Sequence, residues 1–371
     1  MMYKTQQSAK PCYYESHYPL FALDWNEEDY VALGSYKEDS FNKLQVIHSE
    51  DLVTWDKLFE CNVTYPVTRC QWLPKGGGKL ATCSDSLRIW SVGDSLQEQL
   101  NLSLCKYSKQ SSGSTASAAL GSLPPVTSFD WNSVDTNLII SSSIDTTCTV
   151  WDLQSSNYVK TQLIAHDSEV YDVKFLTNST QLFASCGGDG SVRVFDLRCL
   201  AHSTIIYEPL AGLTSGTVKS SGEGNVGGNE DGTNHTALLR LEPSPFDPNV
   251  VATFTQDSNA VLILDMRYPG SPILTLEGHS SAVNQMKWHP TQRNVLLTCG
   301  DDCQVLYWDI NSWLHHSGAA TSKWNTNNVV HSLETPKFAY NDAAEINNIA
   351  WRPQGDWFGM NTGKQFMSVR C

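Results

Sequence analysis

Short runs of apolar residues, separated by turn-forming residues, recur along this chain. Between His166 and Arg198, apolar residues gather at 170–175, 182–184 and 192–195, and a Gly-Gly-Asp-Gly turn precedes the third run. Glycine and aspartate supply the backbone angles that tight hairpins need. The stretch therefore predicts three short β-strands joined by tight turns.

A second stretch, which begins at His279, repeats this pattern in the same register. The distance from histidine to aspartate is 23 positions in both copies, from 166 to 189 and from 279 to 302. Such agreement indicates a repeat protein. Each copy also has a hydroxyl residue four positions before the aspartate and an aromatic residue six positions after it: Ser185, Asp189 and Phe195 in the first, and Thr298, Asp302 and Trp308 in the second.

Five further stretches show the same three apolar runs, which brings the number of units to seven. Their spacing is about 40–45 residues once insertions are removed, a period typical of β-propellers with four-stranded blades. Val, Ile, Thr and tryptophan are frequent in the runs, and these residues favour strands. The five stretches are 18–48, 65–92, 125–153, 235–267 and 345–370.

We call the histidine, the hydroxyl residue, the aspartate and the aromatic residue of each unit its marker residues. Two of the five further units have these marker residues with one or more substitutions, and the last unit has no histidine–aspartate pair. In the third unit a serine stands at the histidine position. In the fifth unit a leucine takes the place of the tryptophan, with one extra residue before it. The residues at these positions are Ser122, Ser141, Asp145 and Trp151 in the third unit and His235, Thr253, Asp257 and Leu264 in the fifth.

The sequence thus predicts an all-β fold, a seven-bladed propeller that forms a single domain over 13–371, and a monomeric protein is expected. The fourth strand of each blade is expected in the connections, for instance at 202–208. A strand at Tyr13–Glu15 is expected to complete the last blade, because an open array would leave a strand edge unpaired. We expect a flexible leader at 1–12 and flexible insertions at about 105–124, 208–234 and 311–343.

Composition and charge indicate which kinds of partner the protein binds and in which cellular compartment it is expected. The formal net charge of −14, without a long basic run, argues against direct binding of nucleic acid. No apolar run approaches 18 residues, so no membrane-spanning helix is expected. The 11 cysteines are odd in number and no two have CxxC spacing. Free thiols in a reducing compartment, cytoplasmic or nuclear, are the expectation.

The recurring hydroxyl residue, histidine and aspartate allow two interpretations. The first is a hydrolase, but an enzyme needs one such site and the set recurs in three units. The second is a buried hydrogen-bond chain that joins each blade's connection to its own turn and to the indole N–H, and we favour this structural role. The residues assigned to it are His166, Ser185 and Asp189; His235, Thr253 and Asp257; His279, Thr298, Asp302 and Trp308; and Ser141, Asp145 and Trp151.

No catalytic, cofactor-binding or metal site is predicted from the remaining motifs. The histidines are scattered, and Cys299 and Cys303 have no second pair at ligand spacing. No GxxxxGK phosphate-binding loop is present, and the glycines at 76–78 are read as a turn between strands.

Several strings of this sequence resemble one group of WD40-repeat proteins. The chain is similar to the family that includes the plant TRANSPARENT TESTA GLABRA proteins and the animal WD-repeat scaffold of DYRK and HIPK kinases. The resemblance covers most of the chain and is densest from 125 to 208. Both long insertions depart from the compact members. The strings are SSIDTTCTVWDL (142–153), TQLIAHDSEVYDVKF (161–175), DGSVRVFDLR (189–198) and HSTIIYE (202–208), with further similarity at 126–132 and 345–351.

This resemblance implies a non-catalytic scaffold that links a DYRK/HIPK-type protein kinase or transcription factors to their partners. An alternative is that the protein is a substrate receptor of a cullin-RING ubiquitin ligase, which in such relatives depends on a Trp-Asp-x-Arg ending of a blade. Otherwise, the arginines of such endings are expected to pair with acids of neighbouring blades. The candidate endings are Phe195-Asp196-Leu197-Arg198 and, less well matched, Leu264-Asp265-Met266-Arg267.

Overall fold

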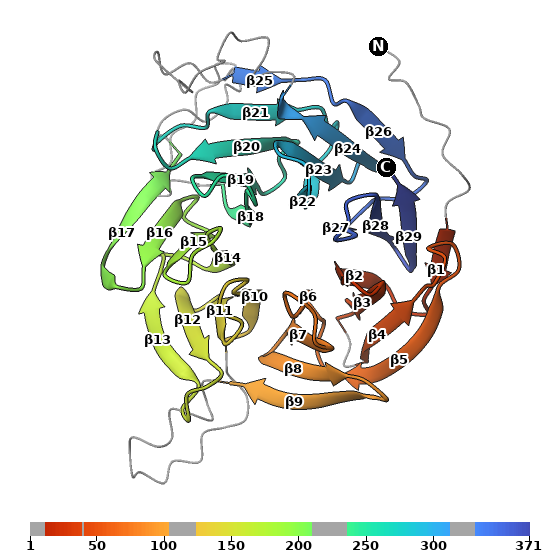
Figure 1. Ribbon diagram of the computed structural model, residues 1–371. Coiled ribbons are helices and arrows are strands. Elements are labelled where there is room, and N and C mark those ends of the chain that lie inside the picture. The colour runs from red at the N-terminus through yellow and green to blue at the C-terminus, as the bar shows by residue number, and fades with distance from the viewer. Residues whose placement is uncertain (1–11, 39–40, 104–123, 210–235, 312–330) are drawn as a thin grey trace, which may run out of the picture.

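Seven β-sheets stand side by side in a closed ring around a central axis in the computed structural model (Figure 1). The structure describes residues 12–38, 41–103, 124–209, 236–311 and 331–371. Each sheet is one blade, and its first strand lies closest to the axis. The seven-bladed all-β propeller predicted from the repeats is therefore confirmed.

Blades 1 to 4 each contain four strands in chain order, and every strand pairs antiparallel with the next. The strand predicted at 202–208 is the fourth strand of blade 4. The four blades comprise β2 (Leu20–Trp25), β3 (Tyr30–Ser35), β4 (Asn42–His48) and β5 (Asp56–Val63); β6 (Arg69–Trp72), β7 (Lys79–Cys83), β8 (Leu87–Val92) and β9 (Leu96–Leu102); β10 (Val126–Trp131), β11 (Leu138–Ser143), β12 (Thr147–Asp152) and β13 (Val159–Ile164); and β14 (Val170–Phe175), β15 (Leu182–Gly187), β16 (Val192–Asp196) and β17 (Cys199–Tyr207).

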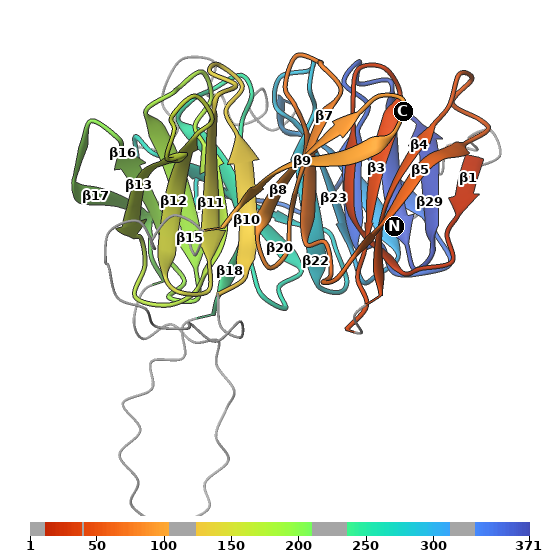
Figure 2. The same cartoon turned by 90° about the horizontal axis from the view of Figure 1, so that it is seen from below.

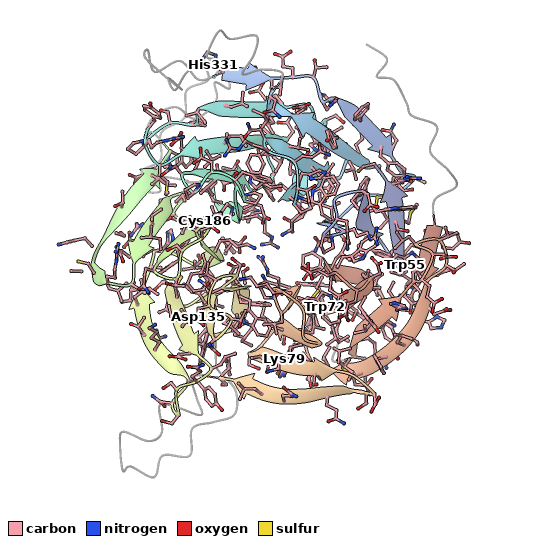
Figure 3. The ribbon with its side chains drawn as sticks, viewed as in Figure 1. Trp55, Trp72, Lys79, Asp135, Cys186 and His331 are labelled. Atoms are coloured by element: carbon pink, nitrogen blue, oxygen red, sulfur yellow. The ribbon has the colours of Figure 1, made fainter. Side chains whose placement is uncertain are left out.

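Blades 5 and 6 share the connection that follows the third strand of blade 6. That connection first adds β25 in parallel to β21 as a fifth strand of blade 5, and then supplies β26 to its own blade. Figure 3 shows His331 of β25 at the outer rim. The strands are β18 (Leu238–Pro243), β19 (Val250–Thr255), β20 (Ala260–Asp265), β21 (Leu274–Glu277) and β25 (His331–Leu333), and β22 (Val283–Trp288), β23 (Val295–Gly300), β24 (Gln304–Asp309) and β26 (Phe338–Asn341).

The prediction of one flexible insertion over 311–343 is therefore wrong for its last part, because 331–341 contains two strands. These strands were missed since they are short and lack clear polar–apolar alternation; neighbouring blades supply the edges that order them. Positions 312–330 of that insertion, positions 105–123 and 210–234 of the other two, and the leader up to position 11 lie outside the described residues. Cys12, assigned to the leader, begins a strand.

The first and last strands of the described chain close the ring. Strand β1 (Cys12–Glu15) pairs antiparallel with β29 (Gln365–Arg370), with Cys12 opposite Ser368. Blade 7 also contains β27 (Asn348–Trp351) and β28 (Trp357–Thr362). The predicted closure by an N-terminal strand is confirmed. The indole of Trp55 in blade 1 reinforces it by donating to the Ser368 hydroxyl of blade 7 at 3.0 Å.

The apolar core lies between the blades. Side chains that alternate along the inner strands reach the facing sheet, and three tryptophans, Trp131, Trp151 and Trp308, are fully buried there. The loops gather on two opposite faces of the ring (Figure 2). We call one the AB face; it carries the loops between the first and second strands, such as 26–29 and 132–137, and those between the third and fourth. The other is the BC face.

Candidate functional site

The marker residues of blade 6 form a continuous buried hydrogen-bond chain. Trp308 can only donate and a carboxylate can only accept, which fixes the direction of the bonds around a neutral imidazole. The Trp308 indole donates to the Thr298 hydroxyl at 2.9 Å, the hydroxyl donates to Nε2 of His279 at 2.7 Å, and Nδ1–H of His279 donates to Asp302 at 2.9 Å. Burial would raise the pKa of Asp302, but the interactions with His279 and the backbone hydrogen bonds from Ser280 and Gln304 together hold this pKa below its usual value.

Blade 4 repeats this geometry without the indole. Nε2 of His166 lies 2.7 Å from the Ser185 hydroxyl, and Nδ1 lies 3.0 Å from both oxygens of Asp189. Phe195 replaces the tryptophan and has no N–H to donate. Arg193 instead adds an ion pair to Asp189 at 3.0 Å.

The arrangement of Ser185, His166 and Asp189 resembles that of a hydrolytic triad, but its environment differs. A nucleophile must reach the substrate, whereas Ser185 and its counterpart Thr298 are both 0% exposed. The same set stands in two blades of one ring. These hydroxyls therefore act as links inside the blades.

Blades 3 and 5 contain only parts of the chain. The Trp151 indole donates to Ser141 at 2.9 Å, while Asp145 accepts from the backbone and hydroxyl of Thr147. Ser122 and His235 lie outside the described residues. The Thr253 hydroxyl donates to the carbonyl of Arg240 instead of a histidine. Asp257 occupies the left-handed backbone region of a turn, with φ of 55°.

Two arginine–aspartate pairs stand on the AB face of neighbouring blades. Arg198 binds Asp196 through two N–H groups, Nε at 2.9 Å and Nη2 at 2.6 Å. Arg267 binds Asp265 in the same way and reaches Asp247 at 3.3 Å. The expected alternative, pairing with acids of neighbouring blades, is wrong, since both arginines bind acids of their own blade.

The two pairs present their guanidinium groups to solvent. The Arg198 side chain is 69% exposed and that of Arg267 is 44% exposed. The hydrogen bonds from Arg198 lower the pKa of Asp196 to about 2, so the carboxylate stays charged near neutrality. The Arg198–Asp196 pair is exposed and stabilises the fold very little. The Asp265 carboxylate is buried, so Arg267 also compensates a buried charge while its own side chain stays accessible to a partner.

A polar channel along the ring axis is a second candidate site, with a volume of about 400 Å³. Its side chains link successive blades through backbone groups. Asp24 accepts from the N–H of Trp72 at 2.7 Å, and Asp130 accepts from that of Phe175 at 3.0 Å. Figure 3 shows Trp72 close to the axis.

Ion pairs complete the lining of this channel. Arg69 binds Asp172 at 3.1 Å, Lys174 binds Asp130 at 3.3 Å, and Lys287 binds Glu242 at 3.2 Å. The sequence analysis missed this set. A usable signal was present, because a polar residue immediately precedes the aromatic residue that ends an inner strand, as in Asp24, Gln71, Asp130, Lys174 and Lys287.

The described residues were also compared with the requirements of a metal site, a disulfide bond and a membrane-spanning helix. In those ranges no three His, Cys, Asp or Glu side chains are grouped to hold a metal ion. The nine cysteines whose side chains are described have free thiols. Over the same part of the chain, no helix has the length and apolar character needed to cross a membrane.

Comparison with known proteins defines the family. The family model for the WD domain, G-beta repeat, matches 119–152, 157–196 and 270–309. A WD repeat-containing protein of Saccharomyces cerevisiae is 59% identical, over 98% of this chain and 77% of its own length. The DDB1- and CUL4-associated factor 7 homolog of Dictyostelium discoideum is 36% identical over 94% of each. An uncharacterized WD repeat-containing protein of Schizosaccharomyces pombe is also 36% identical, over 95% of this chain and 87% of its own length.

A closed ring of seven antiparallel blades, one of them extended by a fifth strand, with these repeated histidine, hydroxyl, aspartate and tryptophan residues defines the class of WD-repeat propellers. The chain belongs to the WD40-repeat family.

Proposed function

We propose that this protein is a non-catalytic scaffold that binds other proteins, and that it docks on the adaptor of a cullin-RING ubiquitin ligase through its AB face. The observation that carries the proposal is the pair of exposed guanidinium groups, Arg198 and Arg267, each held by an aspartate of its own blade. The similarity to a DDB1- and CUL4-associated factor 7 homolog supports the same partner class.

The chemistry of the two pairs suits a protein interface. Arginine presents a planar fork of donors, and a carboxylate that holds the fork reduces the side-chain entropy lost on binding. Blades 3 and 6 end in Gln154 and Asn311 at the matching positions, so they offer no such cation. The docking surface is therefore limited to blades 4 and 5.

Pull-down of the tagged protein tests this docking. We expect the wild type to capture the cullin and its adaptor, and Arg198→Ala combined with Arg267→Ala to lose at least about tenfold of that signal. The melting temperature of Arg198→Ala should stay within about 1 °C, because that pair is exposed and contributes little to stability. Arg267→Ala should lower it, because Arg267 is the ion-pair partner of the buried Asp265 carboxylate, so capture is compared at a temperature at which every variant is folded. Arg293→Ala is a matched control, since Arg293 is an exposed arginine on the AB face whose Nη2 donates to the carbonyl of Phe246. Undiminished capture by the double variant would contradict the proposal.

The substrate side of such a scaffold is proposed to be a DYRK/HIPK-type protein kinase or transcription factors, in the cytoplasm and nucleus. The support is the resemblance of the strings at 142–153 and 189–198 to the scaffold of those kinases. Loops on a rigid ring present several surfaces at once, which suits a protein that joins two partners. Mass spectrometry of the same pull-down tests this part: a kinase or transcription factor at stoichiometric level supports it, and their absence contradicts it.

A further inference from the structure

The polar channel along the ring axis encloses space that no described side chain fills. Its volume of about 400 Å³ lies within the range of about 300–1,000 Å³ that is typical of small-molecule sites. Inner strands of the blades, among them β6, β14, β18 and β22, surround the axis and contribute the walls (Figure 1). The lining also includes Pro74, Ser133 and Pro245 from loops of the AB face, so the channel extends to that face.

The side chains that line this channel carry an excess of positive charge, with four cations and three carboxylates. In a chain with a formal net charge of −14, such an excess is a local exception. A cavity with excess charge of one sign raises the local concentration of ligands of the opposite sign. The cations are Arg69, Lys174, Arg240 and Lys287, and the carboxylates are Asp24, Asp130 and Glu242.

Arg240 is the cation of this lining that forms no ion pair with any described residue. Each of the other three binds a carboxylate, in the ion pairs given above for the channel. The Nη1 group of Arg240 donates to the carbonyl of Leu239 at 2.9 Å, and within the described ranges Nε and Nη2 have no hydrogen-bond partner. A guanidinium group with two such donors fits a phosphate or a carboxylate through parallel hydrogen bonds.

The carboxylates of the lining do not satisfy Arg240. Asp130 and Glu242 are held by lysines of the channel, at 3.3 and 3.2 Å. Asp24 accepts from the N–H of Trp72 and has no ion pair with any residue that the structure describes. Burial raises the pKa of Asp24, so this group repels an anion less than an ordinary carboxylate does.

We propose that the axial channel is a binding site for a small molecule that carries phosphate or carboxylate groups. Arg240 binds one oxyanion through Nε and Nη2. Lys174 and Lys287 supply further donors along the same channel, because an ammonium group has three N–H bonds and each lysine uses one of them on a carboxylate. This site goes beyond the proposed scaffold function and needs no partner protein.

Isothermal titration calorimetry of the full chain with inorganic pyrophosphate and with citrate, in chloride buffer of constant ionic strength, tests the proposal. We expect the wild type to bind at least one of these probes at a single site, and the tighter probe distinguishes phosphate from carboxylate chemistry. Arg240→Gln should bind that probe at least about tenfold more weakly, because it lacks the charge and the fork of donors. Its melting temperature without the probe should stay near that of the wild type, since Arg240 has no ion pair to lose.

Two further variants define the result. Arg293→Gln should bind like the wild type, because Arg293 lies on the AB face outside the channel and donates to the carbonyl of Phe246. Arg240→Lys keeps the charge without the fork and should bind with intermediate affinity. The site assignment is overturned if the wild type binds neither probe at millimolar concentration, if Arg240→Gln binds as tightly as the wild type, or if Arg293→Gln is weakened equally. The pull-down described above tests the scaffold function separately.

Discussion

Single residues explain why the marker pattern differs between blades. Gly278 precedes His279, and a methyl group at this position would lie 2.7 Å from the ring of Trp308. Blade 4 has Ala165 at the matching position, where the smaller Phe195 replaces the tryptophan and both pack in one core cluster. Position 278 therefore needs a glycine because the Trp308 indole occupies the space of a side chain there. The sequence around Gly278 does not show this contact, since Trp308 lies 30 positions further along the chain.

Gly278→Ala should lower the free energy of unfolding by about 1–3 kcal/mol, because the added methyl group overpacks a core with no free space. Urea denaturation measures this. Gly93→Ala is the control, since no atom lies within 4 Å of a methyl group there. An unchanged stability for Gly278→Ala would show that the indole has room to move.

The aspartate of the blade 6 chain makes stability depend on pH. Its pKa is lowered in the folded state, mainly by the hydrogen bond from His279 acting against burial. A lowered folded-state pKa stabilises the fold above the unfolded-state value, about 3.9, and this contribution is lost as the pH falls through the folded-state pKa. We therefore expect Asp302→Asn to lose less stability than the wild type between about pH 5 and pH 3, measured by urea denaturation at each pH. Parallel curves would contradict a role for Asp302.

At the scale of elements, the hydrophobic pattern located the three inner strands of each blade well. It placed the outer strands less well, because strands such as β5 and β13 are largely exposed and show polar and apolar residues in similar numbers. Strands β25 and β26 were missed altogether. Their positions depend on the edges that blades 5 and 6 present, which are distant in sequence.

Strand β1 is the element whose role in closure is easiest to test. Tyr14 lies opposite Phe366 in its pairing with β29. Tyr14→Pro should lower the free energy of unfolding by about 3 kcal/mol, because proline removes a backbone N–H and restricts φ. Thermal unfolding followed by circular dichroism is the measurement. Tyr13→Ala, which removes an exposed side chain and keeps the backbone, should have little effect; equal effects of both would argue against pairing as the cause.

At the scale of the whole molecule, the axial channel joins blades that are far apart in the chain. The buried carboxylate of Asp172 in blade 4 binds Arg69 of blade 2 at 3.1 Å and Ser128 of blade 3 at 2.6 Å. It also accepts from the N–H of Leu241 in blade 5 at 2.9 Å. One side chain thus connects four blades.

Asp172→Ala should lower the free energy of unfolding by about 3–5 kcal/mol, because it leaves Arg69 without its buried partner. Guanidinium denaturation followed by tryptophan fluorescence measures the loss. Asp167→Ala is the control, since the Asp167 side chain is 85% exposed where it pairs with Arg193. A loss no larger than that of the control would mean that the channel ion pairs are solvated enough to be dispensable.

The sequence by itself determined the seven repeats, the class of fold, the strand that closes the ring and the family, because these depend on local alternation, turn residues and spacings that recur in the chain. The tertiary structure alone decided which side chains meet. Asp24 reaches Trp72, Asp172 reaches Arg69 and Trp55 reaches Ser368 because ring closure brings successive blades, and finally the two chain ends, into contact.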